Sequence, residues 1–438
     1  MSDYMFKLES HLSTDQFRVV GQMQDVAAAA GVNLFLTGGA MRDMLGGFPV
    51  RDLDFTVEGS ALKLSKTLAQ KHGAKLVSTD ELRKSVEMIF PGGVPVELAM
   101  ARTEKFAKSG AKPQIAAATI HEDLRCRDFT VNAIALSLNK ASMGLPIDPT
   151  NGVGDIERKE LRTIHNYSFY DDPVRMLRLM RFKVRLGYAI DERTRMQYEN
   201  ALGAEMLTRI TAQALGGELR HMAAEPLAAD LMRTLEEEKL TTLFSPALVG
   251  AKLNLATFAK LQKARQMVPF GVEPGMNTLS LFLEVLLEQL SAKDRAELLK
   301  SVELERAEIN AWQKLAASAK KLERELKADK LKKPSQLYQT VIKAPGEQVL
   351  WLTVYSGQRL VQDRIKNYFE KYLPMSQEIT DEMVTGVAPG TPKFHKAKAE
   401  MILKHLDARP KKAEPVPEPP PLPPMSSFAR GPGVRHAR

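Results

Sequence analysis

The sequence predicts an α/β domain at the N-terminal end of the chain, followed by a long region that is almost entirely helical. Short apolar strands alternate with amphipathic helices between about residues 14 and 140, and helical periodicity dominates from about residue 155 onward. A chain of 438 residues is also too long for a single hydrophobic core, so two to four domains are expected.

The N-terminal elements follow from local patterns of apolar residues, caps and glycines. A capped helix ends at Gly31, a second, short helix ends at a glycine pair, and two later strands flank a Pro-Gly-Gly turn. The expected order is helix 14–31, strand 32–38, helix 39–47, strand 50–59, helix 62–73, and strands 85–90 and 94–100.

The expected domain boundaries follow from the same patterns. The last segment holds nine prolines among scattered basic residues, so it cannot bury a core and is expected to be disordered. The predicted units are an α/β domain 14–143, helical segments 144–215, 216–330 and 331–407, and a Pro-rich basic tail 408–438.

Composition restricts the class of protein. A net charge of +9 suits a polyanionic partner, although charge also serves solubility. Cys126 is the one cysteine, which excludes an intramolecular disulfide and a Cys-rich zinc site. The first residues lack an apolar signal core, and the sequence contains no run of about 18 apolar residues. We therefore expect no membrane span and a cytoplasmic location.

Two carboxylates lie close together after the first predicted helix pair. Asp52 and Asp54 are two residues apart on a predicted strand, so their side chains should point to one face. Adjacent carboxylates repel each other unless a cation lies between them, and a hard ion such as Mg²⁺ prefers oxygen ligands. Glu97, on another predicted strand, could complete the cluster. The alternative is a polar, solvated strand face.

A glycine turn precedes these carboxylates. Gly38 and Gly39 follow an apolar strand, so the backbone can approach a ligand closely. The helix that follows directs its N–H groups at the same place, which favours a phosphate, and Arg42 can add a bidentate contact. A phosphate site beside paired carboxylates is typical of metal-dependent nucleotidyl transfer. An ordinary strand-to-helix turn is the alternative.

The sequence resembles class II tRNA nucleotidyltransferases and bacterial poly(A) polymerases. The segments "GGAMRD" and "RDLDF" resemble the signature of that family. Four further segments follow in the order of the family: "VELAMARTEKF", "EDLRCRDFTVNAIALS", "DPTNGVGDIERKELRTI" and "YDDPVRMLRLMRFKVRLGY". The match covers residues 34–190. Cys126 replaces the usual first arginine of one motif, and Asp171 replaces the usual glutamate of another.

The resemblance implies a fold and a division of labour among the domains. It implies a polymerase β-like nucleotidyltransferase head at 14–143, a nucleotide-reading neck at 144–215, a helical body at 216–330 and a tRNA-binding tail at 331–407. It also implies that Asp52 and Asp54 hold Mg²⁺, with two ions expected, and that Glu97 is a third ligand or a base.

The resemblance further implies a set of nucleotide contacts near these carboxylates: Gly38, Gly39, Arg42, Arg127, Asp128 and Asn132. The glycines and Arg42 would contact the triphosphate, and the last three would hold phosphate and ribose. The alternative for those three is the capped start of a strand or helix.

The segment from Asp172 has two interpretations. Asp172 before Pro173 fits an N-cap, and the arginines that follow at helical spacing fit a solvated basic face. The functional interpretation is base reading. Cytosine and adenine present an amino donor beside a ring-nitrogen acceptor, so a carboxylate and a guanidinium suit them and reject uracil and guanine. Asp172 would pair with Arg175, and Arg178 and Arg181 would reach the base or phosphates.

The resemblance leaves several products open. We expect complete CCA addition to tRNA from CTP and ATP, because segment 103–124 has the character of a mobile loop. Addition of A alone is the second possibility. A poly(A) polymerase is disfavoured because residues 56–100 lack the expected Gly-Arg-Arg-Phe-like element. A non-catalytic RNA-binding relative is disfavoured by the intact Asp52 and Asp54 pair.

The expected partner is tRNA, with no membrane and no obligatory protein partner evident. The tRNA backbone would be held largely through shape and phosphate contacts. The lysines on the helix that starts near Trp312 are candidates, although a solvated Lys-rich helix explains them equally well. Among them, we expect RNA contacts from Lys320, Lys321 and Lys327.

Overall fold

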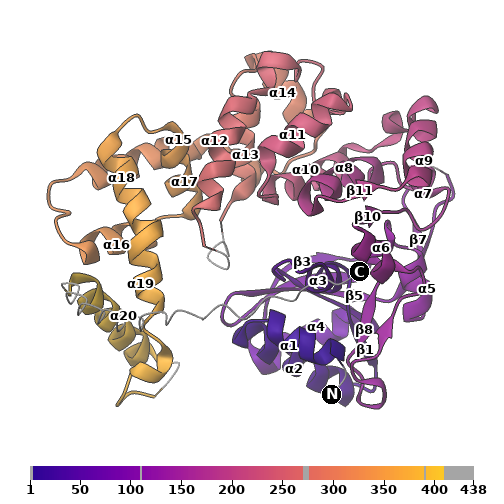
Figure 1. Cartoon of the computed structure of the whole chain (residues 1–438), viewed down its shortest axis with the longest axis horizontal. Helices are drawn as coiled ribbons and strands as arrows, with labels where there is room; N and C mark the ends of the chain where they lie inside the picture. The colour runs from indigo at the N-terminus through magenta and orange to yellow at the C-terminus, as the bar shows by residue number, and fades with distance from the viewer. Residues whose placement is uncertain (1–2, 109–110, 270–275, 389–390, 409–438) are drawn as a thin grey trace, which may run out of the picture.

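The computed structural model describes residues 3–108, 111–269, 276–388 and 391–408. Its elements follow an arc in Figure 1, from the sheet-containing N-terminal domain, through helices α8–α10 and α11–α15, to helices α16–α20 at the other end. An α/β head followed by a largely helical remainder confirms the predicted fold class. The domain boundaries remain proposals, and the predicted tail 408–438 lies outside the described residues except for Ala408. None of the described helices has the length and apolar character needed to cross a membrane.

The head is built on a mixed sheet of seven strands in the order β3-β4-β5-β2-β1-β8-β9. Only the β2–β5 pair is parallel, and the other neighbours are antiparallel. The strands of this sheet are β1 (Asn33–Thr37), β2 (Leu53–Glu58), β3 (Lys75–Asp80), β4 (Ser85–Phe90), β5 (Val94–Met100), β8 (Ala135–Ser137) and β9 (Pro146–Ile147).

Helices of the head follow the expected caps. Ser13 accepts a hydrogen bond from the Gln16 backbone N–H at the start of α2, and Gly47 ends α3 in the left-handed conformation. Helices α2 and α4 pack together and against the sheet. The helical elements of the head are α1 (Asp3–His11), α2 (Thr14–Ala29), α3 (Gly38–Gly46), α4 (Ala61–His72), α5 (Ile120–Arg125), η1 (Thr130–Asn132) and η2 (Lys140–Ser142).

Two features of the head go beyond the sequence prediction. Strand β3 was not expected, because it is an edge strand with five exposed residues and so lacks the alternation of a half-buried strand. The segment 103–124, predicted to be a mobile loop, contributes to a two-stranded hairpin of β6 (Arg102–Lys105) and β7 (Gln114–Ala117), followed by α5, and its mobility stays a prediction. Residues 109–110 of that segment lie outside the described residues.

The remainder of the described chain is helical apart from one short parallel ladder, β10 (Glu160–Leu161) with β11 (Ala189–Ile190). Its first part comprises α6 (Gly152–Arg158), α7 (Ser168–Asp171), α8 (Arg175–Leu186), α9 (Glu192–Gly203), η3 (Met206–Arg209), α10 (Ala212–Ala224), α11 (Ala228–Glu237), η4 (Thr241–Leu243) and η5 (Gly250–Leu253). The later elements are α12 (Leu255–Gln266), α13 (Thr278–Leu287), α14 (Ala292–Ser301), α15 (Arg306–Lys327), α16 (Pro334–Ile342), α17 (Gly346–Tyr355), α18 (Arg359–Asn367), η6 (Tyr368–Tyr372), α19 (Leu373–Gln377), η7 (Asp381–Met383) and α20 (Pro392–Asp407).

A buried ion pair joins helix α8 to helix α10 and the residue that ends it. The Arg181 Nε atom lies 2.6 Å from Glu218 Oε1, and its Nη1 atom lies 3.1 Å from Glu225 Oε1. All three side chains are at most 5% exposed. Burying charges costs hydration free energy, so this group stabilises the arrangement only while every member keeps its partner.

We therefore expect Arg181→Ala to lower the free energy of unfolding by about 3–5 kcal/mol, because it leaves two buried carboxylates without their main cation. Urea denaturation measures the change. The matched control is Arg233→Ala, whose ion pair with Asp230 is about half exposed and should be worth less than about 1 kcal/mol. Equal losses in the two variants would contradict the structural role given to Arg181.

Candidate functional site

The glycine turn between β1 and α3 lies directly against a carboxylate. Gly38 has a φ of +61°, and a Cβ added there would lie 2.9 Å from Arg127 Nη1. A Cβ at Gly39 would lie 2.8 Å from Asp54 Oδ2, which also accepts a hydrogen bond from the Ala40 backbone N–H at 3.2 Å. Glycine is favoured at position 38 by the positive φ and at position 39 by the close approach of Asp54, and the two residues bring the turn, Asp54 and Arg127 together in one site.

Asp54 is part of a row of carboxylates that crosses three strands. In β2 it is in register with Glu97 of the parallel strand β5, and Glu97 is in register with Glu87 of β4. Burial raises the pKa of Asp54 to about 7, and the neighbouring Glu97 and Asp52 carboxylates add to the shift. The sequence prediction did not include Glu87. The Pro-Gly-Gly turn between the two predicted strands could have indicated it, because pairing the strands around that turn places Glu87 opposite Glu97.

The sequence predicted that Asp52 lies on the strand, and the structure contradicts this prediction, because β2 begins at Leu53. Asp52 occupies a bend just before β2, where it is exposed, whereas Asp54 is half-buried inside the strand. The pairing of β2 with β1 starts at Phe55, so Asp52 is not held by that ladder. The two carboxylates still approach closely enough for Asp52 to contribute to the raised pKa of Asp54.

These carboxylates suit a hard cation. Within the described residues, no group of three or more His, Cys, Asp or Glu side chains is arranged as a metal site. Asp52 and Asp54 nevertheless offer oxygen ligands, and a divalent cation would offset the repulsion that Glu97 and Asp52 add to the effect of burial on the pKa of Asp54. The donor set therefore fits Mg²⁺ at these two residues, and Glu97 as a third ligand remains a prediction.

A chain of buried polar contacts leads from the turn toward helix α8. Arg42, which is 3% exposed, donates from Nη1 to Asn132 Oδ1 at 2.7 Å and from Nε to Asp43 Oδ1 at 2.8 Å. Asn132 Nδ2 donates to Asp128 Oδ1 at 2.9 Å. Asp128 Oδ2 accepts from Nε and Nη2 of Arg178 at 2.8 and 2.6 Å. The predicted triphosphate and ribose contacts thus bond mainly to one another.

The same contacts determine the charge of Asp128. Burial alone would favour its neutral form, but Arg178 and Arg175 hold its pKa well below the usual range. Arg127, on the other side of the turn, donates to Asp123 Oδ2 at 2.9 Å and to Thr56 Oγ1 at 3.0 Å. Arg127 and Arg178 are therefore oriented by contacts within the protein, without a contribution from a ligand.

The start of α8 distinguishes the two interpretations of Asp172. The helix begins at Arg175, its cap position is Val174, and no side chain caps it, so the predicted Asp172 N-cap is wrong. Pro173 and Val174 instead form a turn in which the Arg175 N–H donates to the Asp172 carbonyl. The Asp172 carboxylate lies 3.8 Å from Arg175 Nε and is 27% exposed. Burial raises its pKa, and Arg175 and Arg178 oppose that shift.

Arg175 is held from behind by the backbone of the head. Its Nη2 atom donates to the Cys126 carbonyl at 3.2 Å, and its Nη1 atom donates to Ser168 Oγ at 3.0 Å. Because the bond from Arg175 reaches a backbone carbonyl, the cysteine at 126 preserves this contact. The Nε side of Arg175 remains directed toward Asp172.

The remaining predicted residues lie elsewhere. Arg181 contacts Glu218 and Glu225, and these contacts disfavour its predicted role at the nucleotide. The three selected lysines belong to α15, in the second half of the chain, and are exposed there: Lys320, Lys321 and Lys327. Lys327 lies 3.9 Å from Glu323, and a role of the three lysines in RNA binding stays a prediction.

The mixed-sheet head, the glycine turn against a strand carboxylate and the arginine-bearing helix define a nucleotidyltransferase type of site. Residues 34–162 match the family described as the poly A polymerase head domain. The head is therefore similar to the head domain of tRNA nucleotidyltransferases and poly(A) polymerases. The match covers the turn, the carboxylates and Arg127 through Asn132.

Curated relatives differ in the product that their names state. The chain is 34% identical over 245 residues to the A-adding tRNA nucleotidyltransferase of Halalkalibacterium halodurans, covering 56% of this chain and 55% of that protein. It is 33% identical over 217 residues to the CC-adding enzyme of Deinococcus radiodurans, covering 49% of this chain and 56% of that one. The chain thus spans about half the length of these relatives.

Solved structures share the whole fold. The apo form II of a CCA-adding enzyme matches with a TM-score of 0.56 at 24% identity, covering 94% of this chain and 96% of that one. The Thermotoga maritima CCA-adding enzyme complexed with tRNA matches with a TM-score of 0.52 at 24% identity, over 94% and 96% of the two chains. At this identity the likeness establishes the fold.

The raised pKa of Asp54 predicts a pH-dependent stability in the absence of divalent metal. The folded state binds this proton more tightly than the unfolded state, so the stabilisation is present below about pH 4 and is lost as pH rises to about 7. The unfolding free energy of the protein, relative to that of Asp54→Asn, should therefore fall across this range. Urea denaturation at each pH, in the presence of chelator, measures the difference.

Added Mg²⁺ provides the control for this prediction. At pH 8 it should raise the unfolding free energy of the unaltered protein more than that of Asp54→Asn, since a cation stabilises the ionised carboxylate. A difference between the two proteins that stays constant from pH 4 to pH 8 would contradict the assignment.

Proposed function

We propose that this protein is a tRNA nucleotidyltransferase that transfers nucleotides from CTP and ATP to the 3′ end of tRNA. The observation that carries the proposal is the meeting of two features at one place: the carboxylate Asp54 against the Gly38–Gly39 turn, and the Asp172–Arg175 pair at the start of α8. The buried contacts of Arg42, Asn132, Asp128 and Arg178 connect them.

The proposed reaction is attack of the RNA 3′-hydroxyl on the α-phosphate, with pyrophosphate as the leaving group. Asp52 and Asp54 would hold Mg²⁺, which supplies electrostatic stabilisation of the phosphates and lowers the pKa of the attacking hydroxyl. At the N-terminus of α3, the Gly38 N–H donates to the Ile134 carbonyl and the Ala40 N–H donates to Asp54, so the Gly39 N–H and the helix dipole would act on the triphosphate. Asp128 and Asn132, already oriented by Arg178 and Arg42, would position the ribose.

Base choice is assigned to Asp172 and Arg175. The carboxylate accepts a hydrogen bond from an exocyclic amino group, and the guanidinium donates one to the adjacent ring nitrogen, which cytosine and adenine both allow. Asp172 is free for this role because it caps no helix. Arg175 is kept in place by the Cys126 carbonyl and Ser168.

The product proposed is the complete CCA end, with A-only addition as the second candidate. The charges of Arg83 and Glu104 affect the pKa of Asp172, so the hairpin that carries Glu104 lies within electrostatic range of the proposed reading position. A hairpin at that place could change the fit of the site after two cytidines are added. The proteins similar to this chain include an A-adding and a CCA-adding enzyme, so both candidate products occur among them.

The domains are proposed to divide the work as head 14–143, neck 144–215, body 216–330 and tail 331–407. The tail and the exposed lysines of α15 would contact the tRNA backbone, where charge and shape suffice. A poly(A) polymerase is the weaker proposal because the Gly-Arg-Arg-Phe-like element is missing from residues 56–100.

The activity is tested with tRNA transcripts that end before the CCA sequence, after the first C and after CC. We expect CTP incorporation into the first two and ATP incorporation into the third. Asp54→Asn should reduce all of these at least about 100-fold, because the bound cation stabilises the transition state by several kcal/mol. The control Asp230→Asn removes an exposed carboxylate of α11 and should retain full activity.

The outcomes separate the candidates. Incorporation of A alone, only into tRNA ending in CC, would replace the CCA proposal with the A-adding one. Activity of Asp54→Asn equal to that of the unaltered protein would overturn the site.

Base reading is tested by Asp172→Ala with four-nucleotide selectivity and melting temperature measured on the same preparation. Use of UTP and GTP relative to CTP and ATP should rise by about 5- to 150-fold, the range expected when about 1–3 kcal/mol of discrimination is lost. The melting temperature should change little, because no helix cap is lost. Asp171→Ala, which removes the neighbouring carboxylate, should leave selectivity unaltered. A large drop in melting temperature with unchanged selectivity would contradict the assignment.

A further inference from the structure

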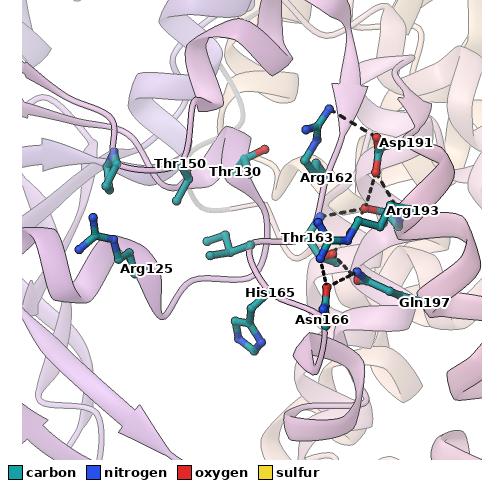
Figure 2. Close-up of a pocket in the computed structure, with 13 residues that line it drawn as sticks. Arg125, Thr130, Thr150, Arg162, Thr163, His165, Asn166, Asp191, Arg193 and Gln197 are labelled. Atoms are coloured by element: carbon teal, nitrogen blue, oxygen red, sulfur yellow. Dashed lines mark hydrogen bonds and ion pairs between the residues drawn. The ribbon is translucent and has the colours of Figure 1, made fainter.

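A second cavity lies behind the segment that carries Arg127 and Asp128, outside the proposed catalytic site. It has a volume of about 450 Å³ and is open to the surface between α5, the loop before α6, the strand end after β10, and α9. Figure 2 shows Arg125 and Thr150 on one side, His165 below, and Arg162, Asp191 and Arg193 on the other side. The volume lies within the range of about 300–1,000 Å³ that small-molecule sites occupy.

Two buried hydrogen-bonding atoms in this wall have no partner. They are the Thr150 hydroxyl oxygen and the Nε atom of Arg162. Buried polar groups are nearly always hydrogen-bonded, so an unpaired group in a roomy polar cavity indicates a bound group that the chain itself does not supply. The guanidinium of Arg125 is a donor of a different kind, because it lines the cavity from an exposed position and forms no ion pair with the residues that the structure describes.

Asp191 is an acidic side chain in the cavity lining, and it pairs with Arg162. The Nη2 atom of Arg162 also lies 3.6 Å from Asp155 and 3.4 Å from Glu160, so the donors left for a ligand are mainly Arg162 Nε and the Arg125 guanidinium. Asp191 accepts from the Thr194 backbone N–H at 3.1 Å and lies 3.4 Å from Arg162 Nη2. Arg193 donates to Asn166 Oδ1, which also accepts from Gln197. His165 has its pKa lowered by burial and by Arg175, so at neutral pH it is an uncharged ring with one N–H donor.

We propose that this cavity binds a phosphate group, supplied by a nucleotide or by the backbone of RNA. The guanidinium of Arg125 and the Nε–H of Arg162 would donate to the phosphate oxygens, and the Thr150 hydroxyl would complete the contact. The cavity exceeds the size of a phosphate, which leaves room for an attached sugar. The site is distinct from the catalytic one, because Arg125 and Thr130 face it whereas the Arg127 and Asp128 side chains bond toward the turn and α8.

The test is equilibrium binding to the full chain, without Mg²⁺ or triphosphate, so that its result does not depend on nucleotidyl transfer. Inorganic phosphate and AMP are titrated by calorimetry, and tRNA is titrated by fluorescence anisotropy at several salt concentrations. The variants are Arg125→Gln and Thr150→Val, and the matched control is Arg209→Gln, an exposed arginine outside the cavity. Melting temperatures verify folding, and Thr150→Val keeps the test valid if the other variant is unstable.

Arg125→Gln should weaken the binding of phosphate or AMP by about tenfold, as expected for one charged hydrogen bond, while Arg209→Gln has no effect. If RNA is the source, Arg125→Gln should weaken tRNA binding and reduce its salt slope by about one, with phosphate and AMP unaffected. Thr150→Val should weaken the same ligand as Arg125→Gln. The proposal is overturned if both cavity variants bind all three ligands as the unaltered protein does, or if Arg209→Gln weakens binding equally.

Discussion

The partly buried ion pair between Asp128 of the head and Arg178 of α8 is the constraint on which the rest of the site depends. Through Asn132 and Arg42 it extends to the Gly38–Gly39 turn, so the carboxylate side and the reading helix share one hydrogen-bonded chain. A buried ion pair contributes little net stability, because desolvation offsets the attraction. Its effect is on position, since a displacement of α8 would leave buried charges without partners.

A second ion pair supports the same joint between head and helix. Arg185 donates from Nη2 to Asp43 Oδ2 at 2.8 Å, and Asp43 is the residue that also orients Arg42. Arg185 additionally lies 3.7 Å from Glu225, which Arg181 contacts as well. The polar contacts therefore run without interruption from the glycine turn, through α8, to the end of α10.

The four arginines of α8 consequently divide into different roles. Helical spacing places them on one broad face, and the sequence alone is equally consistent with a solvated face or a nucleotide-binding face. In the structure, Arg178, Arg181 and Arg185 pair mainly with Asp128, with Glu218 and Glu225, and with Asp43. Only Arg175, held by backbone carbonyls and Ser168, keeps its Nε side toward a free carboxylate. The stripe is thus mainly a joint between domains, with one reading position at its start.

Local patterns in the sequence were enough to predict the strands at 85–90 and 94–100, the helix ends at Gly47 and Gly73, and the close approach at Gly38 and Gly39. They could not supply what depends on distant partners. Arg181 and Glu218 are 37 residues apart, and nothing local to either residue indicates their contact.

Two errors have local physical causes. The Asp172 cap failed because Pro173 and Val174 form a turn before the helix begins. Edge strand β3 was not predicted because most of its residues are exposed, and it therefore lacks the alternation of apolar and polar residues that identifies a half-buried strand.

The central claim is that Asp128 and Arg178 hold the head and the reading helix as one unit. A double-mutant cycle with Asp128→Asn, Arg178→Gln and the double variant measures it, with unfolding free energies from urea denaturation. The account predicts a coupling free energy of about 1.5–3 kcal/mol, because removing either partner already breaks the pair. Effects of the two substitutions that simply add would contradict it.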